Sequence, residues 1–169
     1  MSHPHLALTA QALRPLREAM EKLCRESEAS SAALLQDCGQ ALLETGETAR
    51  DSGENGALAV GAFFAARQLA LRLGETDFAG LHYEGKSRHF FVTPVDAAHF
   101  LLIVFDHRSS LAVVRACARR ALPELASAVA YLLNQSANIV PFTLPPEAPS
   151  ALFSEQPRGG GLAPHGTGF

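Results

Sequence analysis

One stretch of the sequence has the spacing of a phosphate-binding loop. It runs from Gly80 to Ser87, fits the pattern G-x-x-x-x-G-K-[ST], and is followed by an apolar run that ends at Asp106, the position of a magnesium-binding aspartate. Such a loop needs a helix directly after it, because the first amides of that helix hold the phosphates. The residues after Ser87 instead favour a strand and include Pro94. We therefore predict a hairpin turn, and a P-loop enzyme is the least favoured alternative, which failure to bind nucleotide would exclude.

The histidines and serines of the same region offer no better catalytic set. Four histidines fall on or beside expected strands, without a Cys, Asp or Glu at metal-ligand spacing: His82, His89, His99 and His107. Ser109 and Ser110 stand close to Asp106 and His107, but adjacent residues do not readily form a triad, and helix capping explains the serines. We expect no metal, no cofactor and no catalytic centre.

The composition indicates a protein that buries surface against a partner. The 169 residues are 47% hydrophobic and 18% charged, with a net charge of −3, whereas about 25% charged residues is usual. The near-neutral balance argues against nucleic acid as that partner. Three scattered cysteines, Cys24, Cys38 and Cys117, indicate a reducing compartment. With no apolar run of about 20 residues and no signal-peptide pattern, we expect no contact with a membrane and a cytoplasmic location.

Proline and glycine content separates a tail from the folded part. Residues 136–169 hold six of the ten prolines and five of the thirteen glycines, so we expect a disordered C-terminal tail there. Residues 10–135 are the expected domain and residues 1–9 a flexible N-terminus. Within the tail, Leu152 and Phe153 belong to a small apolar island that is able to dock on a surface.

Hydrophobic periodicity predicts eight elements in the order α-β-β-α-β-β-β-α. The first helix carries Leu13 to Leu23, the second spans Gly56–Leu73, and the third is capped by Ser109 or Ser110 and should be kinked or interrupted by Pro123. The expected strands are Ala32–Gln36, Gln40–Glu44, Phe78–Tyr83, Arg88–Val95 and His99–Phe105, of which the last is apolar on both faces and therefore central. The fold class is α/β (α+β), a sandwich of helices on a five-stranded, mostly antiparallel sheet.

The second helix is apolar on two sides. One stripe suits the sheet and consists of Leu58, Ala62, Ala65, Leu69 and Leu73. The opposite side carries Val60, Phe63, Phe64, Arg67 and Leu71. In so small a domain a second apolar side is normally covered, and Phe and Arg are common interface anchors. We expect this side to bind a partner or a second copy; the alternative is cover by the chain's own first helix or tail.

The sequence resembles the roadblock family, relatives of the dynein light chain, and especially its bacterial MglB-type members. The resemblance covers about residues 10–135. It rests on Gly61, on Leu73-Gly74-Glu75, on Tyr83-Glu84-Gly85, and above all on the run from Val104 to Arg115, which is similar to the family's Phe-Asp-x-Arg-Thr-Ser-Leu-Gly-Leu-Val-Arg. The chain departs from the family at Phe63 and Phe64, where small residues are usual, at Tyr83, where His is common, and at Pro123.

The resemblance implies a homodimer with a sheet continuous across two protomers. Its paired central helices would form a platform for a small Ras-like GTPase of the MglA type, in bacterial cell polarity or gliding motility. Such proteins stimulate GTP hydrolysis by reshaping the GTPase, without an arginine finger, and the family's contact positions fall on Phe64 and Gln68. By the same resemblance, Val140–Glu155 would be equivalent to the family's C-terminal extension, which is associated with contacts to the GTPase that favour nucleotide exchange.

We thus expect the chain to be a GTPase-activating regulator without a catalytic centre of its own. The alternative is a scaffold that pairs with other roadblock or polarity proteins without affecting hydrolysis. The predicted partner-binding residues are Val60, Phe63, Phe64, Arg67, Gln68 and Leu71, with Leu152 and Phe153 as a tail contact.

Overall fold

The computed structural model describes residues 4–47 and 52–137 of the chain, and within these ranges the expected order of elements is confirmed. The helices are α1 (Pro4–Ser27), α2 (Ser52–Arg72) and α3 (Leu111–Ala137). The strands are β1 (Ser31–Gln36), β2 (Ala41–Gly46), β3 (Leu81–Glu84), β4 (His89–Pro94) and β5 (His99–Phe105). Helix α1 begins six residues before the expected start of the domain. The expected tail contact at Leu152 and Phe153 lies outside the described residues.

The five strands form one sheet in the order β2-β1-β5-β4-β3, and every neighbouring pair is antiparallel. Strand β5 lies in the centre, as its two apolar faces predict, and its Leu101 and Ile103 are fully buried. The β1–β2 hairpin turns at Gly39, whose φ is +85°. A Cβ atom there would lie 2.3 Å from the Cα atom of Ala57 at the start of α2, so the turn also lets α2 approach the sheet closely.

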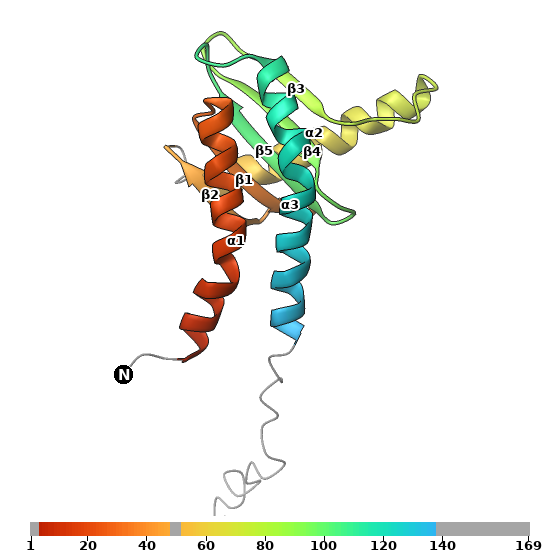
Figure 1. The fold of residues 1–169 in the computed structure, drawn as a ribbon. Coiled ribbons are helices and arrows are strands. Elements are labelled where there is room, and N and C mark those ends of the chain that lie inside the picture. Colours follow the sequence, from red (N-terminus) through yellow and green to blue (C-terminus); the bar gives the residue numbers. More distant parts are fainter. Residues whose placement is uncertain (1–3, 48–51, 138–169) are drawn as a thin grey trace, which may run out of the picture. The chain divides into compact units, whose positions relative to one another are not determined.

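Helices cover both faces of the sheet, and residues that alternate along the strands decide which face each helix covers (Figure 1). On one face α1 and α3 pack against each other and against Leu34, Leu101 and Ile103. On the other face α2 packs against Leu35 and Leu102. Because successive strand side chains point to opposite faces, the central strands supply apolar residues to two cores at once. The core between α2 and the sheet fixes the position of α2 and leaves its outer side exposed.

Helix α3 runs unbroken from Leu111 to Ala137 with Pro123 inside it. The expectation that this proline interrupts the helix is therefore wrong. A proline removes the hydrogen bond to the carbonyl four residues earlier, here that of Arg119. Both Arg119 and Pro123 are exposed, so water can solvate that carbonyl. Packing of the opposite side of α3, through the fully buried Leu125 and Val129, offsets the loss of this hydrogen bond.

Candidate partner-binding surface

Helix α2 rests on the sheet through the side that the sequence assigned to a partner. Val60 and Phe63 are each 2% exposed, whereas Leu58 and Leu73 of the other stripe are 71% and 74% exposed. The expectation about which stripe faces the sheet is therefore wrong. Val60 and Phe63 belong to the core, and the stripe of Leu58, Ala62, Ala65, Leu69 and Leu73 faces away from it.

An aromatic cluster explains this orientation. The ring of Phe63 lies 5.2 Å from the ring of Phe78 and 5.2 Å from that of Phe100, measured between centroids. Phe64 lies beside it, edge-on to Phe100 at 5.3 Å. Large rings fill the space between a helix and a sheet better than the alanines of the opposite stripe, and each buried ring contributes about 2 kcal/mol or more. The two phenylalanines that depart from the family pattern thus have a structural role.

The second half of α2 has little beneath it. From Arg67 to its last residue, Arg72, the helix contains no buried residue, and Figure 1 shows it continuing past the strands. Arg67, Gln68 and Leu71 are exposed. On a helical wheel, Phe64, Gln68 and Leu71 share one flank, and the stripe that starts at Leu58 occupies the other. Helix α2 therefore presents two separate surfaces, one on each flank.

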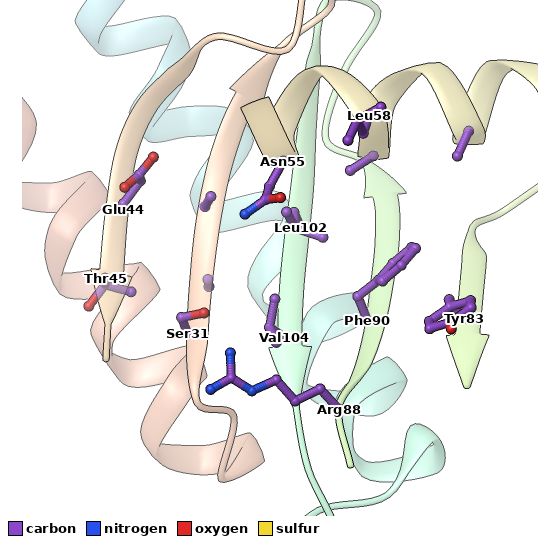
Figure 2. Close-up of a pocket in the computed structure, with 14 residues that line it drawn as sticks. Ser31, Glu44, Thr45, Asn55, Leu58, Tyr83, Arg88, Phe90, Leu102 and Val104 are labelled. Atoms are coloured by element: carbon purple, nitrogen blue, oxygen red, sulfur yellow. The ribbon is translucent and has the colours of Figure 1, made fainter. Parts of the chain in front are cut away.

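A groove of about 570 Å³ opens beside the Leu58 flank, between the first half of α2 and the sheet. Figure 2 shows Leu102, Val104 and Phe90 on its floor, with Leu58 on one wall. The full lining is Ser31, Ala32, Ala33, Glu44, Thr45, Asn55, Leu58, Ala59, Ala62, Tyr83, Arg88, Phe90, Leu102 and Val104. Burial raises the pKa of Glu44. The floor is apolar, so the groove suits an apolar helix or side chain better than a charged ligand.

Small residues continue on the outer side of α2. Gly61 is exposed, and a Cβ atom built there meets no atom within 4 Å. Glycine inside a helix costs about 1 kcal/mol relative to alanine, and nothing within the described part of the chain requires it. Ala62 and Ala65 beside it are also exposed. Such a surface allows the backbone of another molecule to approach closely.

Comparison with known proteins identifies the fold. The profile of the Roadblock/LC7 domain matches residues 15–105. The chain belongs to the Roadblock/LC7 family. MglB of Myxococcus xanthus superposes with a TM-score of 0.61 at 27% identity, covering 67% of this chain and 93% of that chain.

Two further solved structures are similar. Gliding protein MglB of Thermus thermophilus superposes with a TM-score of 0.63 at 25% identity, covering 69% of this chain and 90% of that chain. A Roadblock/LC7 domain of Streptomyces avermitilis shares the fold, with a TM-score of 0.59, 22% identity and coverage of 68% and 95%. No curated protein sequence matches the chain.

The loop with phosphate-binding spacing is a hairpin in this roadblock domain, as predicted. Gly85 and Ser87 lie in the turn that joins β3 to β4, so a strand and not a helix follows them directly. Gly85 is needed for the tightness of that turn, because a Cβ atom would lie 2.3 Å from the carbonyl oxygen of Arg88. The amides that hold phosphate at the start of a helix have no counterpart here.

Three histidines of the roadblock domain, His82, His89 and His99, pack against other residues of the domain. His99 is buried, and its Nδ1 lies 2.8 Å from Oδ1 of Asp96. That carboxylate also accepts hydrogen bonds from the N–H groups of Ala98 and His99. Burial opposes ionisation of Asp96, but these hydrogen bonds outweigh it and lower its pKa. His82 and His89 stack on Phe105. In residues 4–47 and 52–137 no three His, Cys, Asp or Glu side chains form a metal-binding group.

The run that carried the family resemblance joins the sheet to α3. The N–H of Val113 donates to Oγ of Ser110, so the serine caps the helix as expected. Arg108 donates from Nε to Asp106 Oδ1 at 3.0 Å and from Nη2 to Oγ of Ser30 at 3.3 Å. The Arg108 hydrogen bonds lower the pKa of Asp106. These contacts hold β5, α3 and the start of β1 together. No helix in the described ranges is long and apolar enough to cross a membrane.

Proposed function

We propose that this roadblock chain is a homodimeric regulator that binds a small Ras-like GTPase of the MglA type and stimulates its GTP hydrolysis in bacterial cell polarity or gliding motility. The observation that carries the proposal is the exposed, apolar α2, with a groove along one flank and a second exposed flank opposite. The likeness to two MglB structures at 25% and 27% identity supports it. The chain would act without a catalytic centre of its own.

The groove flank is suited to a second copy of the chain. Leu69 and Leu73 are exposed near the end of α2 that projects past the strands, while the groove beside Leu58 is open. A second copy related by a two-fold axis would place the projecting half of its α2 along this groove. The projecting half of α2 in the first copy would lie in the groove of the second copy in the same way. Strand β3 lies at the edge of the sheet, so its outer side is available to extend the sheet into that copy.

The other flank is suited to the GTPase. Phe64, Gln68 and Leu71 lie there with Arg67 beside them, and all four are exposed. The buried Val60 and Phe63 hold this flank in place from beneath rather than contacting the partner. Binding energy that favours one conformation of the GTPase switch loops would shift their population and order the GTPase's own catalytic groups. The regulator would then need no reactive group.

Single-turnover GTP hydrolysis by an MglA-type GTPase, with and without this protein, tests the activating role. The rate is expected to rise with protein concentration and to saturate. Full binding without acceleration would overturn the proposal and leave a scaffold. Binding to the GTP-loaded and GDP-loaded GTPase gives the matched comparison, because a scaffold binds both forms equally, whereas an activator of hydrolysis favours the GTP form.

Sedimentation velocity tests the homodimer. The full chain is expected to sediment as a dimer, and Leu69→Lys as a monomer, because a charge would be buried in the apolar groove contact. Arg72→Lys, which keeps the charge on the same half of α2, is the control and should remain dimeric. A dimer unaffected by Leu69→Lys would place the contact elsewhere.

A further inference from the structure

The edge strand β3 carries two ionisable side chains on one face of the sheet. His82 and Glu84 are two residues apart, so they point to the same face, the one covered by α1 and α3. Leu81 and Tyr83 point to the other face, where Tyr83 lines the groove beside Leu58 (Figure 2). A strand that pairs with the outer side of β3 therefore meets an imidazole and a carboxylate on one face and a tyrosine ring on the other.

His82 and Glu84 have polar groups that the single chain does not match. The Nε2 atom of His82 is buried and has no hydrogen-bond partner among the described residues. Glu84 is exposed and takes part in no ion pair within residues 4–47 and 52–137, although His89 stands directly opposite it on β4. Polar groups at a buried contact normally find partners. Both side chains are therefore suited to a contact that a second chain supplies.

Two-fold symmetry limits how β3 can pair with the same strand of a second copy. Directly opposite residues of an antiparallel pair point to the same face, so the two strands must pair about one residue that faces its own copy. An axis at Tyr83 places His82 opposite Glu84 of the second copy. An axis at His82 places two imidazoles opposite each other, and an axis at Glu84 does the same with two carboxylates. An axis at Leu81 places His82 opposite Gly80. Among these registers, only the one centred on Tyr83 brings opposite charges together.

We propose that β3 pairs with β3 of a second copy in the register centred on Tyr83, and that the contacts between His82 and Glu84 make this dimer tighter at acidic pH. This register rests on the proposed homodimer and adds to it a defined junction and a control by pH. Opposite charges on directly opposite strand residues stabilise a sheet, whereas like charges destabilise it. The two-fold axis makes the contact occur twice. On the other face the two Tyr83 rings meet, each stacked on Phe90 of its own chain at 5.1 Å between centroids.

The direction of the pH effect follows from the charges around His82. Imidazole gains a proton as the pH falls through about 6.5, whereas a glutamate stays ionised to about pH 4–5. On the same face His89 lies opposite Glu84, and the guanidinium of Arg115 lies over Phe91, the residue opposite His82. These groups face His82 in the monomer as well as in the dimer. The carboxylate of the second copy is added only in the dimer, so proton binding and dimerisation strengthen each other.

Disulfide formation between engineered cysteines tests the register. The background is the full chain with Cys38→Ser, which removes an exposed thiol and should itself give no cross-link. Tyr83→Cys should form a disulfide-linked dimer on oxidation with diamide, because directly opposite residues have Cα atoms about 4.5–5.5 Å apart, within disulfide range. His82→Cys should not link to itself, because the two copies of this residue lie diagonally across the junction. It should link to Glu84→Cys when the two variants are co-expressed.

Sedimentation velocity of dilution series at pH 8.0 and pH 5.5 tests the pH effect. The dissociation constant of the wild-type dimer should be at least about threefold lower at pH 5.5, because two contacts between opposite charges are gained. His82→Asn and Glu84→Gln should each remove this difference, since each leaves one charge without its partner. His107→Asn, a change at an exposed histidine outside β3, is the matched control and should keep the difference.

A disulfide between two His82→Cys chains would overturn the inference, because it requires a different register. A Tyr83→Cys chain that sediments as a dimer but forms no disulfide would overturn it too, as would a wild-type dimer equally tight at both pH values or a pH effect that Glu84→Gln leaves unchanged. In each of these cases the homodimer of the proposed function stands. A wild-type chain that sediments as a monomer at every concentration would instead contradict the homodimer itself, so the two failures are distinguishable.

Discussion

The rings of Phe63 and Phe100 lie 5.2 Å apart between centroids, and this contact joins the middle of α2 to the beginning of the central strand β5. Phe63 is buried, yet it stands one residue before the half-exposed Phe64. The same pair of neighbouring residues therefore serves two surfaces. Phe63 fixes the helix to the sheet, and Phe64 stands at the edge of the flank that we assign to the GTPase.

Phe63→Ala is expected to lower the free energy of unfolding by about 3 kcal/mol, because it leaves a cavity between Phe78 and Phe100. Leu69→Ala, on the exposed flank, should change the unfolding of the isolated chain by less than about 0.5 kcal/mol. Urea denaturation followed by circular dichroism, at concentrations low enough to avoid dimers, measures both. Equal losses for the two variants would contradict the observed orientation of α2.

The orientation of α2 shows where sequence reasoning stops. The order and approximate bounds of the elements could be predicted, because strand alternation, the turn at Gly39 and the cap at Ser110 are local signals. The side of α2 that packs on the sheet could not be predicted, because both sides of the helix are apolar and periodicity does not distinguish them. The choice depends on Phe78 and Phe100, which come from distant positions in the chain and leave a space that a large ring fills.

Phe64→Arg is expected to abolish binding of the GTPase while the domain remains folded. Phe64 is 37% exposed, so an arginine can direct its charged end to water, and the lost contact with Phe100 should cost about 1–2 kcal/mol of stability. Titration calorimetry with the GTP-loaded GTPase, together with circular dichroism, measures both effects. Val113→Arg, on the opposite side of the sheet, should bind normally. Retained binding by Phe64→Arg would remove this flank from the interface.

Arg67→Ala is expected to reduce the stimulated rate of GTP hydrolysis by less than about fivefold. An arginine finger contributes about 10³-fold or more, and we propose that the GTPase supplies its own catalytic groups. Arg72→Ala, on the same exposed half of α2, controls for the loss of a positive charge. Single-turnover rates at saturating protein are the readout. A loss of several hundredfold for Arg67→Ala alone, with binding intact, would show that the chain inserts a catalytic arginine.

Gly61 offers a test that separates stability from binding. Gly61→Ala should raise the free energy of unfolding by about 1 kcal/mol, since the helix gains and a Cβ atom meets no neighbour. Gly61→Met should also leave the isolated chain folded, but it should weaken GTPase binding at least tenfold by keeping the partner's backbone away from α2. Ala116→Met, on the outer side of α3, is the control. Full affinity in Gly61→Met would mean that the GTPase does not approach α2 closely at this point.

Asp96→Asn should destabilise the domain in a way that depends on pH. The hydrogen bonds from Ala98 and His99 lower the pKa of Asp96 in the folded chain, so the folded state favours the carboxylate.

The contribution of these hydrogen bonds to stability is present above the pKa of Asp96 in the unfolded chain, which is about 3.9. It is lost as the pH falls through the lower pKa of Asp96 in the folded chain. We expect Asp96→Asn to lower the free energy of unfolding at pH 6–7 by less than about 1 kcal/mol, because the Asp96 side chain is 38% exposed and water screens its charge. The loss should shrink further at the acid end of the range in which the chain stays folded. Urea denaturation across pH 3–7 measures the difference, with the exposed Asp77→Asn as the control. A cost that stays constant from pH 7 to pH 3 would show that the carboxylate charge contributes nothing and that Asp96 acts through the shape of the turn alone.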